Sequence, residues 1–365
     1  MQVTDLTVEV RDSTLTRLGQ IMPADLVGAK FIERFNAVGS WEITLRGDSP
    51  MAALLRAAGT GIVVTGPSGV FFSGPTTGAT LRQTTEDPVG QWILSGVDDS
   101  TILYDRLAYP TPSVSDVTAQ TSAYDVRSGT CSTVILGYVN DNIGTTASTA
   151  RKISNLTMGA DPAIGGAVSY SARFDTLQSV AYKLAWAKGL GFQVLQSGSN
   201  LVFSVYQPVD RTASVRLDIY NNRLDSSDYG YTAPEVTRAI VAGEGSNTNR
   251  VFLEVTTASS TAAESVWVRR IERFVDSRST SDTTELTVAG QAELADKGMT
   301  VTGLSVAPRD MDSMRYLIDW NLGDSVSVVV GTDTIQQVVQ EVGIGIAEDG
   351  VRIIATVGFP NGLDQ

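Results

Sequence analysis

The sequence predicts a mainly β protein, α+β overall, with β-rich ends around an α+β middle. Two observations favour this class. Short stretches of alternating apolar and polar residues dominate both ends of the chain, whereas helical periodicity is confined to a few segments. The 34 glycines among 365 residues suit the many tight turns of a β-rich fold. A chain of this length, 42% hydrophobic and 18% charged, can form two or three globular domains.

The first domain is expected over residues 1–108 and is built from strands and one short helix. Alternation predicts strands over residues 6–10, 40–45 and 61–65, punctuated by Gly-Pro and Ser-Gly turns. Ser49 as N-cap, Pro50 at the first helical position and Gly59 as the stop predict a helix over 51–58.

An α+β insert is expected over residues 109–208, after a Pro-Thr-Pro-Ser linker. Apolar periodicity predicts one helix over 132–142 that ends near Gly144. A second helix is expected to begin at Asp175, with Gln178 three residues later as a variant capping box, and to end at Gly189. Two strands follow, over residues 191–195 and 201–206.

A second β domain with a helical insertion near 286–297 is expected over residues 209–365. Alternation predicts strands over residues 213–219, 238–243, 250–256, 266–274, 325–330, 334–342 and 350–357. The inserted helix ends at Lys297-Gly298, a cation in the last turn followed by a glycine. Asp349-Gly350 supplies a hairpin turn. The two β-rich ends are candidates for related barrels, although no sequence repeat links them.

Charge and residue counts exclude several classes of protein. A net charge of −13 opposes tight binding to a phosphate backbone, although an acidic wall would let DNA pass without sticking. The absence of histidine excludes Ser-His-Asp and Cys-His hydrolases and zinc peptidases. The single cysteine, Cys131, excludes internal disulfides and cysteine-based zinc clusters. Glycosidases need only two carboxylates, so composition leaves them open.

The sequence carries no targeting or membrane signal. The first residues lack the basic and apolar regions of a signal peptide, and no apolar run approaches the ~20 residues of a spanning helix. We therefore expect the chain to be made and folded in the cytoplasm, with no stable membrane insertion.

Candidate ligand residues each have a simpler structural interpretation. Asp225, Asp228 and residues 140–142 offer oxygen ligands for Ca²⁺, but neither segment matches the calcium-loop pattern, and solvated turns account for both. Residues 243–246 and 189–192 are glycine turns without the features of a phosphate loop. The acids that a glycosidase would most plausibly use are interpreted as solubilising loop residues: Asp310, Asp312, Glu348 and Asp349.

Aromatic and basic residues raise two further hypotheses. The tryptophans that would form a sugar platform are Trp41, Trp92, Trp186, Trp267 and Trp320. Trp41 and Trp267 lie in predicted alternating strands, which favours core or interface packing. Arg269, Arg270 and Arg273 lie in a basic predicted strand and are either contacts to a neighbouring subunit or ordinary surface charge. No residue is assigned as catalytic, cofactor-binding or metal-binding, and no cofactor is expected.

Several strings in a fixed order resemble one protein family. Residues 31–43, Phe-Ile-Glu-Arg-Phe-Asn-Ala-Val-Gly-Ser-Trp-Glu-Ile, look like the N-terminal signature of the tail-hub, or minor tail, proteins of long-tailed phages that infect actinobacteria. Similar strings continue in the family's order at residues 49–58, 61–64, 72–75, 172–177, 189–192, 208–212 and 322–326. The resemblance therefore extends over nearly the whole chain.

The resemblance implies a structural virion protein of the tail tip, with a baseplate-hub fold of two β-barrels beside α/β inserts. Three subunits would form a ring whose six barrels approximate the sixfold tail tube. Such a homotrimer joins the tube or distal tail protein to the tip and contacts the tape-measure protein and tip or fibre proteins. It also lines the channel through which genomic DNA passes without specific binding. Some relatives carry a C-terminal hydrolase, and the short segment after the last predicted strand leaves no room for one here.

The absence of histidine, the single cysteine and the lack of a catalytic motif indicate a protein that is not an enzyme, and channel-lining and interface residues are left unknown. Two alternatives stay open. One is a carbohydrate-binding tail protein that recognises the host surface. The other is a glycan hydrolase that uses two carboxylates.

Overall fold

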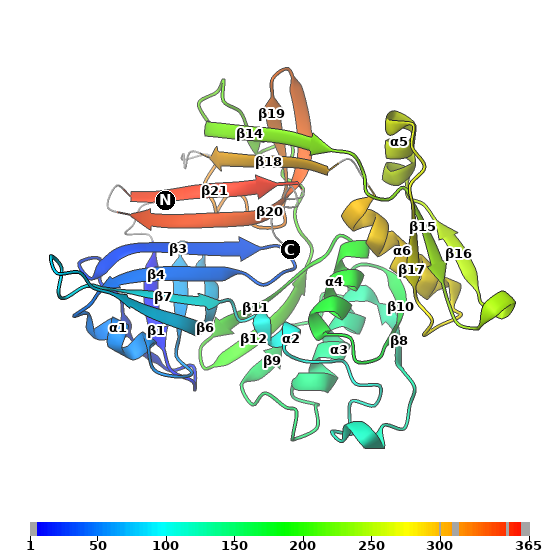
Figure 1. The fold of residues 1–365 in the computed structure, drawn as a ribbon, viewed down its shortest axis with the longest axis horizontal. Coiled ribbons are helices and arrows are strands. Elements are labelled where there is room, and N and C mark those ends of the chain that lie inside the picture. Colours follow the sequence, from blue (N-terminus) through cyan, green and yellow to red (C-terminus); the bar gives the residue numbers. More distant parts are fainter. Residues whose placement is uncertain (1–5, 299–300, 309–313, 348–349, 359–365) are drawn as a thin grey trace.

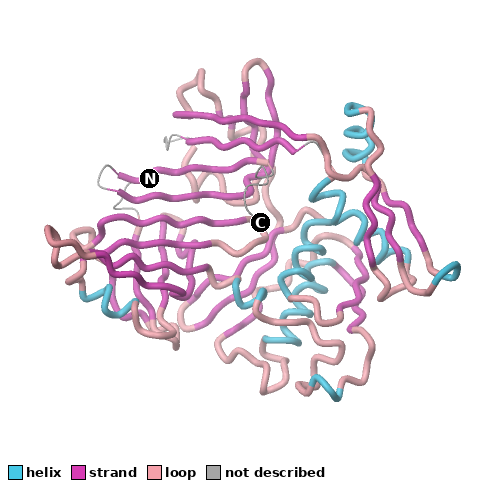
Figure 2. The backbone as a smooth tube through the Cα atoms, in the orientation of Figure 1, coloured by secondary structure: helices cyan, strands magenta, loops and turns pink. Residues whose placement is uncertain are grey.

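The computed structural model describes residues 6–298, 301–308, 314–347 and 350–358. Strands form 42% and helices 19% of the structure, which confirms the mainly β class. Figure 1 shows a large sheet to which both ends of the chain contribute. Figure 2 shows that most of the helices gather on the other side of the molecule, between smaller sheets.

The large sheet has 13 strands and a main path in the order β14-β18-β21-β20-β3-β4-β7-β6-β5-β1-β2, with β19 beside β20 and β13 beside β19. The strands from the N-terminal end are β1 (Thr7–Arg11), β2 (Arg17–Gln20), β3 (Leu26–Arg34), β4 (Ser40–Arg46), β5 (Gly61–Gly66), β6 (Gly69–Arg82) and β7 (Gln91–Val97). Those from the C-terminal end are β13 (Arg216–Leu217), β14 (Leu224–Thr232), β18 (Val301–Pro308), β19 (Ser325–Val330), β20 (Asp333–Ala347) and β21 (Gly350–Val357).

The two ends of the chain meet at the antiparallel pair β3–β20. Glu341 lies opposite Arg34 and accepts a hydrogen bond of 2.8 Å from its Nε, and Ile344 lies opposite Phe31. Successive side chains of a strand point to opposite faces. Phe31 and Ile344, both fully buried, therefore face the core, while Lys30 lies on the other, exposed face.

One core serves both ends of the chain. Its largest fully buried side chains include Trp320, Tyr316, Phe31 and Phe72. Helix α1 (Pro50–Leu55) adds the buried Ala52 and Leu55. The predicted start of this helix, after Ser49 with Pro50 in the first turn, is confirmed, but the helix ends three residues before the predicted limit.

A middle unit has a core of its own. Its strands are β8 (Asp125–Thr130), β9 (Leu156–Met158), β10 (Ala167–Ala172), β11 (Gly191–Ser197) and β12 (Asn200–Tyr206). Its helices are α2 (Thr101–Tyr104), the 3-10 turn Val117–Ala119, α3 (Cys131–Ile143) and α4 (Leu177–Ala187). Helices α3 and α4 pack together over buried residues such as Ile135 and Leu184, and they confirm the two predicted helices. The predicted hairpin is confirmed as the antiparallel pair β11–β12.

A third unit lies within the C-terminal part of the sequence, beside α4 (Figure 1). Its elements are β15 (Arg238–Ala242), the 3-10 turn Asn247–Asn249, β16 (Phe252–Val255), α5 (Ala258–Trp267), β17 (Glu272–Asp276) and α6 (Thr283–Lys297). The sheet order is β16-β15-β17. Val241 of β15 and Leu286 and Leu294 of α6 are fully buried against one another. Helix α6 confirms the predicted helix that ends before Gly298.

Four local predictions differ from the structure. The N-cap of α4 is Thr176, whose side chain accepts from the Ser179 N–H, and not Asp175. The Gln178 side chain does not reach back to the cap but donates to the Asn36 carbonyl at 2.7 Å. The strand predicted over 266–274 is wrong in its first part, because α5 occupies residues up to Trp267. The strand predicted over 213–219 shrinks to the two residues of β13.

The predicted pair of barrels is not confirmed, since no closed barrel is found among the described residues. The strands from the two ends form one open path and share one core instead. The domain limits at 108/109 and 208/209 stay a prediction.

Candidate functional site

Two open edges of the large sheet, at β14 and at the second half of β6, are candidates for contact with another chain. In the stretch β14-β18-β21-β20-β3-β4-β7-β6, strand β14 pairs only with β18. At the other end, residues 78–82 of β6 pair only with β7, because the first half of β6 turns away to pair with β5. These statements hold for the described residues. Open edges offer unpaired N–H and C=O groups that pair readily with a further strand.

The sheet face opposite the core carries a furrow and charges of both signs. Strand β20 has Gly343 and Gly345 on this face, and the missing side chains leave a furrow of about 560 Å³ beside β3 and β21. One row across the strands runs from Arg352 through Gly345 and Lys30 to Glu42. The face therefore combines cations and anions, although the whole chain is acidic.

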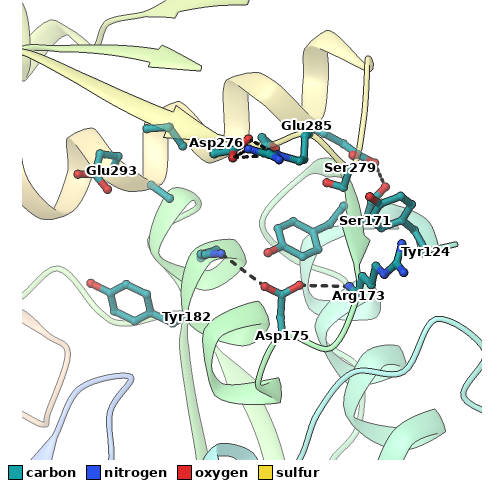
Figure 3. A pocket seen from close by; sticks show the side chains of 16 residues that line it. Tyr124, Ser171, Arg173, Asp175, Tyr182, Asp276, Ser279, Glu285 and Glu293 are labelled. Carbon is teal, nitrogen blue, oxygen red and sulfur yellow. Dashed lines mark hydrogen bonds and ion pairs between the residues drawn. The ribbon is translucent and has the colours of Figure 1, made fainter. Parts of the chain in front are cut away.

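A polar cavity of about 390 Å³ lies between the middle and third units. Figure 3 shows Asp276, Glu285 and Glu293 of the third unit on one side and Arg173, Asp175 and Tyr182 of the middle unit across from them. The wall also includes Tyr124, Tyr170 and three serines. We call this space the inter-unit cavity.

Most charges around the inter-unit cavity are paired within the protein. Asp276 accepts from Arg278 Nε at 2.9 Å and also pairs with Arg250. Asp175 lies 4.0 Å from the Lys183 ammonium, and Glu293 accepts from Lys297 at 3.3 Å. The cavity is therefore polar but close to electrically balanced.

Two partly buried acids, Glu33 and Asp98, lie near the junction between the large sheet and the β11–β12 hairpin. Desolvation raises the pKa of Glu33 to about 8, although the Tyr316 hydroxyl donates to its Oε2 at 2.6 Å. Desolvation likewise raises the pKa of Asp98 to about 6, against the effect of hydrogen bonds from the backbone N–H groups of Gly39 and Ser100. Both residues are partly exposed; Glu33 lies in β3 and Asp98 directly follows β7.

The structure gives the candidate calcium ligands other roles. Asp225 and Asp228 lie in strand β14, so the expected solvated turn is wrong there. Residues 140–142 form the end of α3. Asp141 pairs with Arg127 at 2.8 Å, and the buried Asn142 accepts from Arg151 at 2.9 Å. Within the described ranges, no group of three or more acidic or cysteine side chains is arranged to hold a metal ion.

The predicted glycine turns lie within the described residues, whereas the candidate glycosidase acids do not. Residues 243–246 follow β15 as a loop, and Gly189 follows α4 with a φ of 63°, as a helix stop requires. The candidate glycosidase acids lie outside the described residues: Asp310, Asp312, Glu348 and Asp349.

The tryptophans lie in separate environments. Trp41 and Trp320 are buried in the large core, and Trp92 packs against that core with the Arg56 guanidinium 4.2 Å above its ring. Trp186 of α4 stacks on Tyr182. Trp267 ends helix α5, so its predicted strand position is wrong.

Two of the three candidate interface arginines, Arg270 and Arg273, form ion pairs within the third unit. Arg270 binds Glu272 at 2.7 Å and Glu254 at 3.1 Å, and Arg273 lies 3.9 Å from Glu235. Arg269 and Arg270 precede β17, and Arg273 lies within it. Their side chains are exposed, so a contact to another subunit stays a prediction.

The inter-unit cavity was missed by the sequence interpretation. Glu285 lies in the first turn of α6, where an acid is common because it complements the helix dipole. Tyr170 occupies an ordinary strand position in β10. Neither residue carries a local signal, because the cavity forms only when two units from distant parts of the sequence pack together.

Three solved structures have the same fold. The chain matches the 43 kDa tail protein of prophage MuSo2 from Shewanella oneidensis with a TM-score of 0.61 and 11% identity, over 100% of both chains. It matches a tail protein from Neisseria meningitidis with a TM-score of 0.56 and 11% identity, over 98% of this chain and 96% of the other. It matches prophage tail protein gp18 from Listeria monocytogenes with a TM-score of 0.55 and 11% identity, over 96% and 94%.

The fold is thus one that phage tail proteins share. The sequence pattern of the siphovirus ReqiPepy6 Gp37-like protein family matches residues 7–359, and the chain belongs to that family. The resemblance to tail proteins of long-tailed phages is therefore confirmed. A search of curated proteins found no match to the chain.

Membrane-spanning helices were also sought. Among the described residues, no helix combines the length and apolar character needed to cross a bilayer.

Proposed function

We propose that the chain is a structural, non-enzymatic protein of a phage tail tip, in which three copies form a hub ring. The ring joins the tail tube or distal tail protein to the tip and encloses the DNA ejection channel. Family membership supports the tail assignment. The pair of open edges at β14 and β6 carries the proposal of a ring.

The open edges suit head-to-tail association. They lie at opposite ends of the stretch from β14 to β6, so β14 of one copy can pair with residues 78–82 of β6 in the next. Contacts between two different surfaces generate a closed ring when the rotation between copies is right. The predicted domains 1–108 and 209–365 each supply four strands to the stretch from β14 to β6, so three copies provide six such halves. Six halves match the sixfold tube that the family resemblance implies.

In this assembly the furrowed face of β3, β20 and β21 is a candidate wall of the channel. Gly343 and Gly345 present no side chains there, and the charges of both signs on this face offer no continuous cationic track for phosphates. Passing DNA would therefore not bind there tightly. The distal tail protein, the tape-measure protein and tip or fibre proteins are the proposed partners, and the virion tail tip is the proposed location, with assembly in the host cytoplasm.

A crosslinking experiment in phage particles tests the ring. Ser226→Cys on β14 and Thr80→Cys on β6 are combined in one chain and treated with a short bis-maleimide. The native Cys131 is fully buried and does not compete. A closed ring of three gives covalent products of two and three chains and none larger, because the third link closes the circle.

Each single variant serves as a matched control and should give no covalent multimer. A ladder that extends past three chains would contradict a closed trimer. Imaging of the same particles should show three copies around the axis at the distal end of the tube. Copies at the periphery of the tail would defeat the hub assignment.

A further inference from the structure

The inter-unit cavity contains three polar groups that the protein itself does not satisfy. Glu285 is only 5% exposed, and its Oε1 accepts from Ser171 at 2.9 Å and Ser169 at 3.1 Å. Its Oε2 has no hydrogen bond or ion pair to any described residue. A buried carboxylate without a cation is costly unless its oxygens find donors. One acceptor therefore faces the cavity.

Two donors complement this acceptor. The Tyr170 hydroxyl lines the cavity and has no hydrogen-bond partner among the described residues. Desolvation raises the pKa of Tyr170, so its hydroxyl keeps the proton and can donate. The Arg173 guanidinium lies 5.5 Å from the Tyr124 ring and forms no ion pair within the described part of the chain.

The remaining charges restrict what the cavity accepts. Asp175, Asp276 and Glu293 are each paired with a cation, as described above. Within the described wall of the cavity, the charges that remain without an ion pair are the positive charge of Arg173 and the negative charge of Glu285. An anionic ligand would meet Glu285, and a cationic ligand would meet Arg173, so a neutral polar ligand is favoured.

We propose that the inter-unit cavity binds a neutral carbohydrate. A sugar hydroxyl both donates and accepts, so it can satisfy Glu285 Oε2 together with the donors Tyr170 and Arg173. The tyrosine rings offer apolar surface to the C–H faces of a sugar ring. A volume of about 390 Å³ lies within the usual range for small-ligand sites. The proposal does not depend on the hub ring, because the cavity lies away from both open sheet edges.

Binding is tested with the full chain on an array of neutral and acidic oligosaccharides, followed by titration of the best neutral ligand. Glu285→Gln keeps one oxygen that can accept from the two serines, but it removes the negative charge and the second acceptor oxygen. We expect binding to weaken at least about ten-fold. Tyr170→Phe removes only the hydroxyl and should weaken binding about three-fold to ten-fold. Tyr220→Phe, at a residue 78% exposed outside the cavity, is the matched control and should bind as the wild type does.

Melting temperatures of all variants show whether each chain is folded. The proposal is overturned when no neutral oligosaccharide binds above the blank surface. It is also overturned when folded Glu285→Gln and Tyr170→Phe bind as tightly as the wild type. Stronger binding of acidic oligosaccharides, or of a basic peptide used as a competitor, would contradict the neutral class.

Discussion

Single residues decide how the large sheet is fixed to the middle unit. Arg11 of β1 is 4% exposed and Asp99 is 3% exposed, and Arg11 Nη1 donates to Asp99 Oδ2 at 2.8 Å and to Gln196 Oε1 at 2.9 Å. Ser73 donates to the same Asp99 oxygen at 2.6 Å. Gln196 belongs to β11, so the buried network joins two units with separate cores. Alternation in the sequence predicted β1 but could not show which acid pairs with Arg11.

Replacing Asp99 by Asn should lower the free energy of unfolding by about 3 kcal/mol, because the Arg11 charge stays buried without its counterion. Urea unfolding followed by circular dichroism measures this change. Asp48→Asn is the control, since its pair with Arg46 lies at the surface and should contribute nothing measurable. A loss equal to that of the control would show that solvent reaches Arg11.

Glu33 should make the free energy of unfolding depend on pH. Desolvation raises the pKa of Glu33 from its ordinary value of 4.5 to about 8. Between these values the folded state holds the proton more tightly than the unfolded state does. The group therefore stabilises the fold fully below pH 4.5, and this contribution is lost as the pH rises to about 8.

Glu33→Gln should consequently flatten the decrease in unfolding free energy between pH 5 and pH 8. One proton limits the slope from Glu33 to about 1.4 kcal/mol per pH unit. Denaturant titrations at several pH values compare the variant with the wild type. Asp98, with its pKa near 6, contributes in the same direction in the lower part of this range in both proteins. Parallel profiles would contradict a raised pKa at Glu33.

At the scale of elements, capped helices were predicted better than strand limits. Pro50 and the glycines after α3, α4 and α6 act locally, so their signals are readable in the sequence. Helix α5 was missed because its Ser, Thr and Ala residues form no apolar stripe, with only Ala263 and Ser260 buried. The apolar Val266 and Val268 then resembled an exposed strand. Its capping box uses Thr257 with Ser260, in place of the usual acid at the third position.

The C-cap of α5 carries strain that a substitution should relieve. Val268 has φ 51° and ψ 39°, a left-handed conformation that a β-branched residue adopts at a cost. It is 87% exposed, so little packing is lost on removing the side chain. Val268→Gly should stabilise the third unit by about 1 kcal/mol.

Val266→Gly is the matched control, because this residue is 76% exposed but lies inside the helix. It should destabilise the unit by roughly 0.5–1 kcal/mol. Hydrogen exchange of α5 amides measures both changes locally. Equal losses in the two variants would show that the helix end is not strained.

At the scale of the whole molecule, the sequence predicted the mainly β fold class but not that strands from the two ends of the chain pair with each other. The β-rich ends, the middle helices and the family resemblance were readable from local strings. The pairing of β3 with β20 depends on contacts between residues such as Phe31 and Ile344, which no local pattern reports. The inter-unit cavity depends in the same way on how α6 packs against β10 and α4. Separate barrels were expected because each end alternates by itself, whereas the strands join in one open path.

The open edge of β6 allows a substitution that should prevent assembly without disturbing the fold of the chain. Thr80 lies on the exposed edge half of β6, where a charged side chain is a common means of blocking strand addition. Thr80→Lys should leave the melting temperature of the purified chain nearly unchanged, since an exposed substitution costs within about 0.5 kcal/mol. It should nevertheless keep the protein out of assembled tails, as measured by immunoblots of purified particles. Ser115→Lys, in an exposed loop of the middle unit, adds the same charge away from the edge and should still be incorporated. Normal incorporation of Thr80→Lys would place the contact between copies elsewhere than the β6 edge.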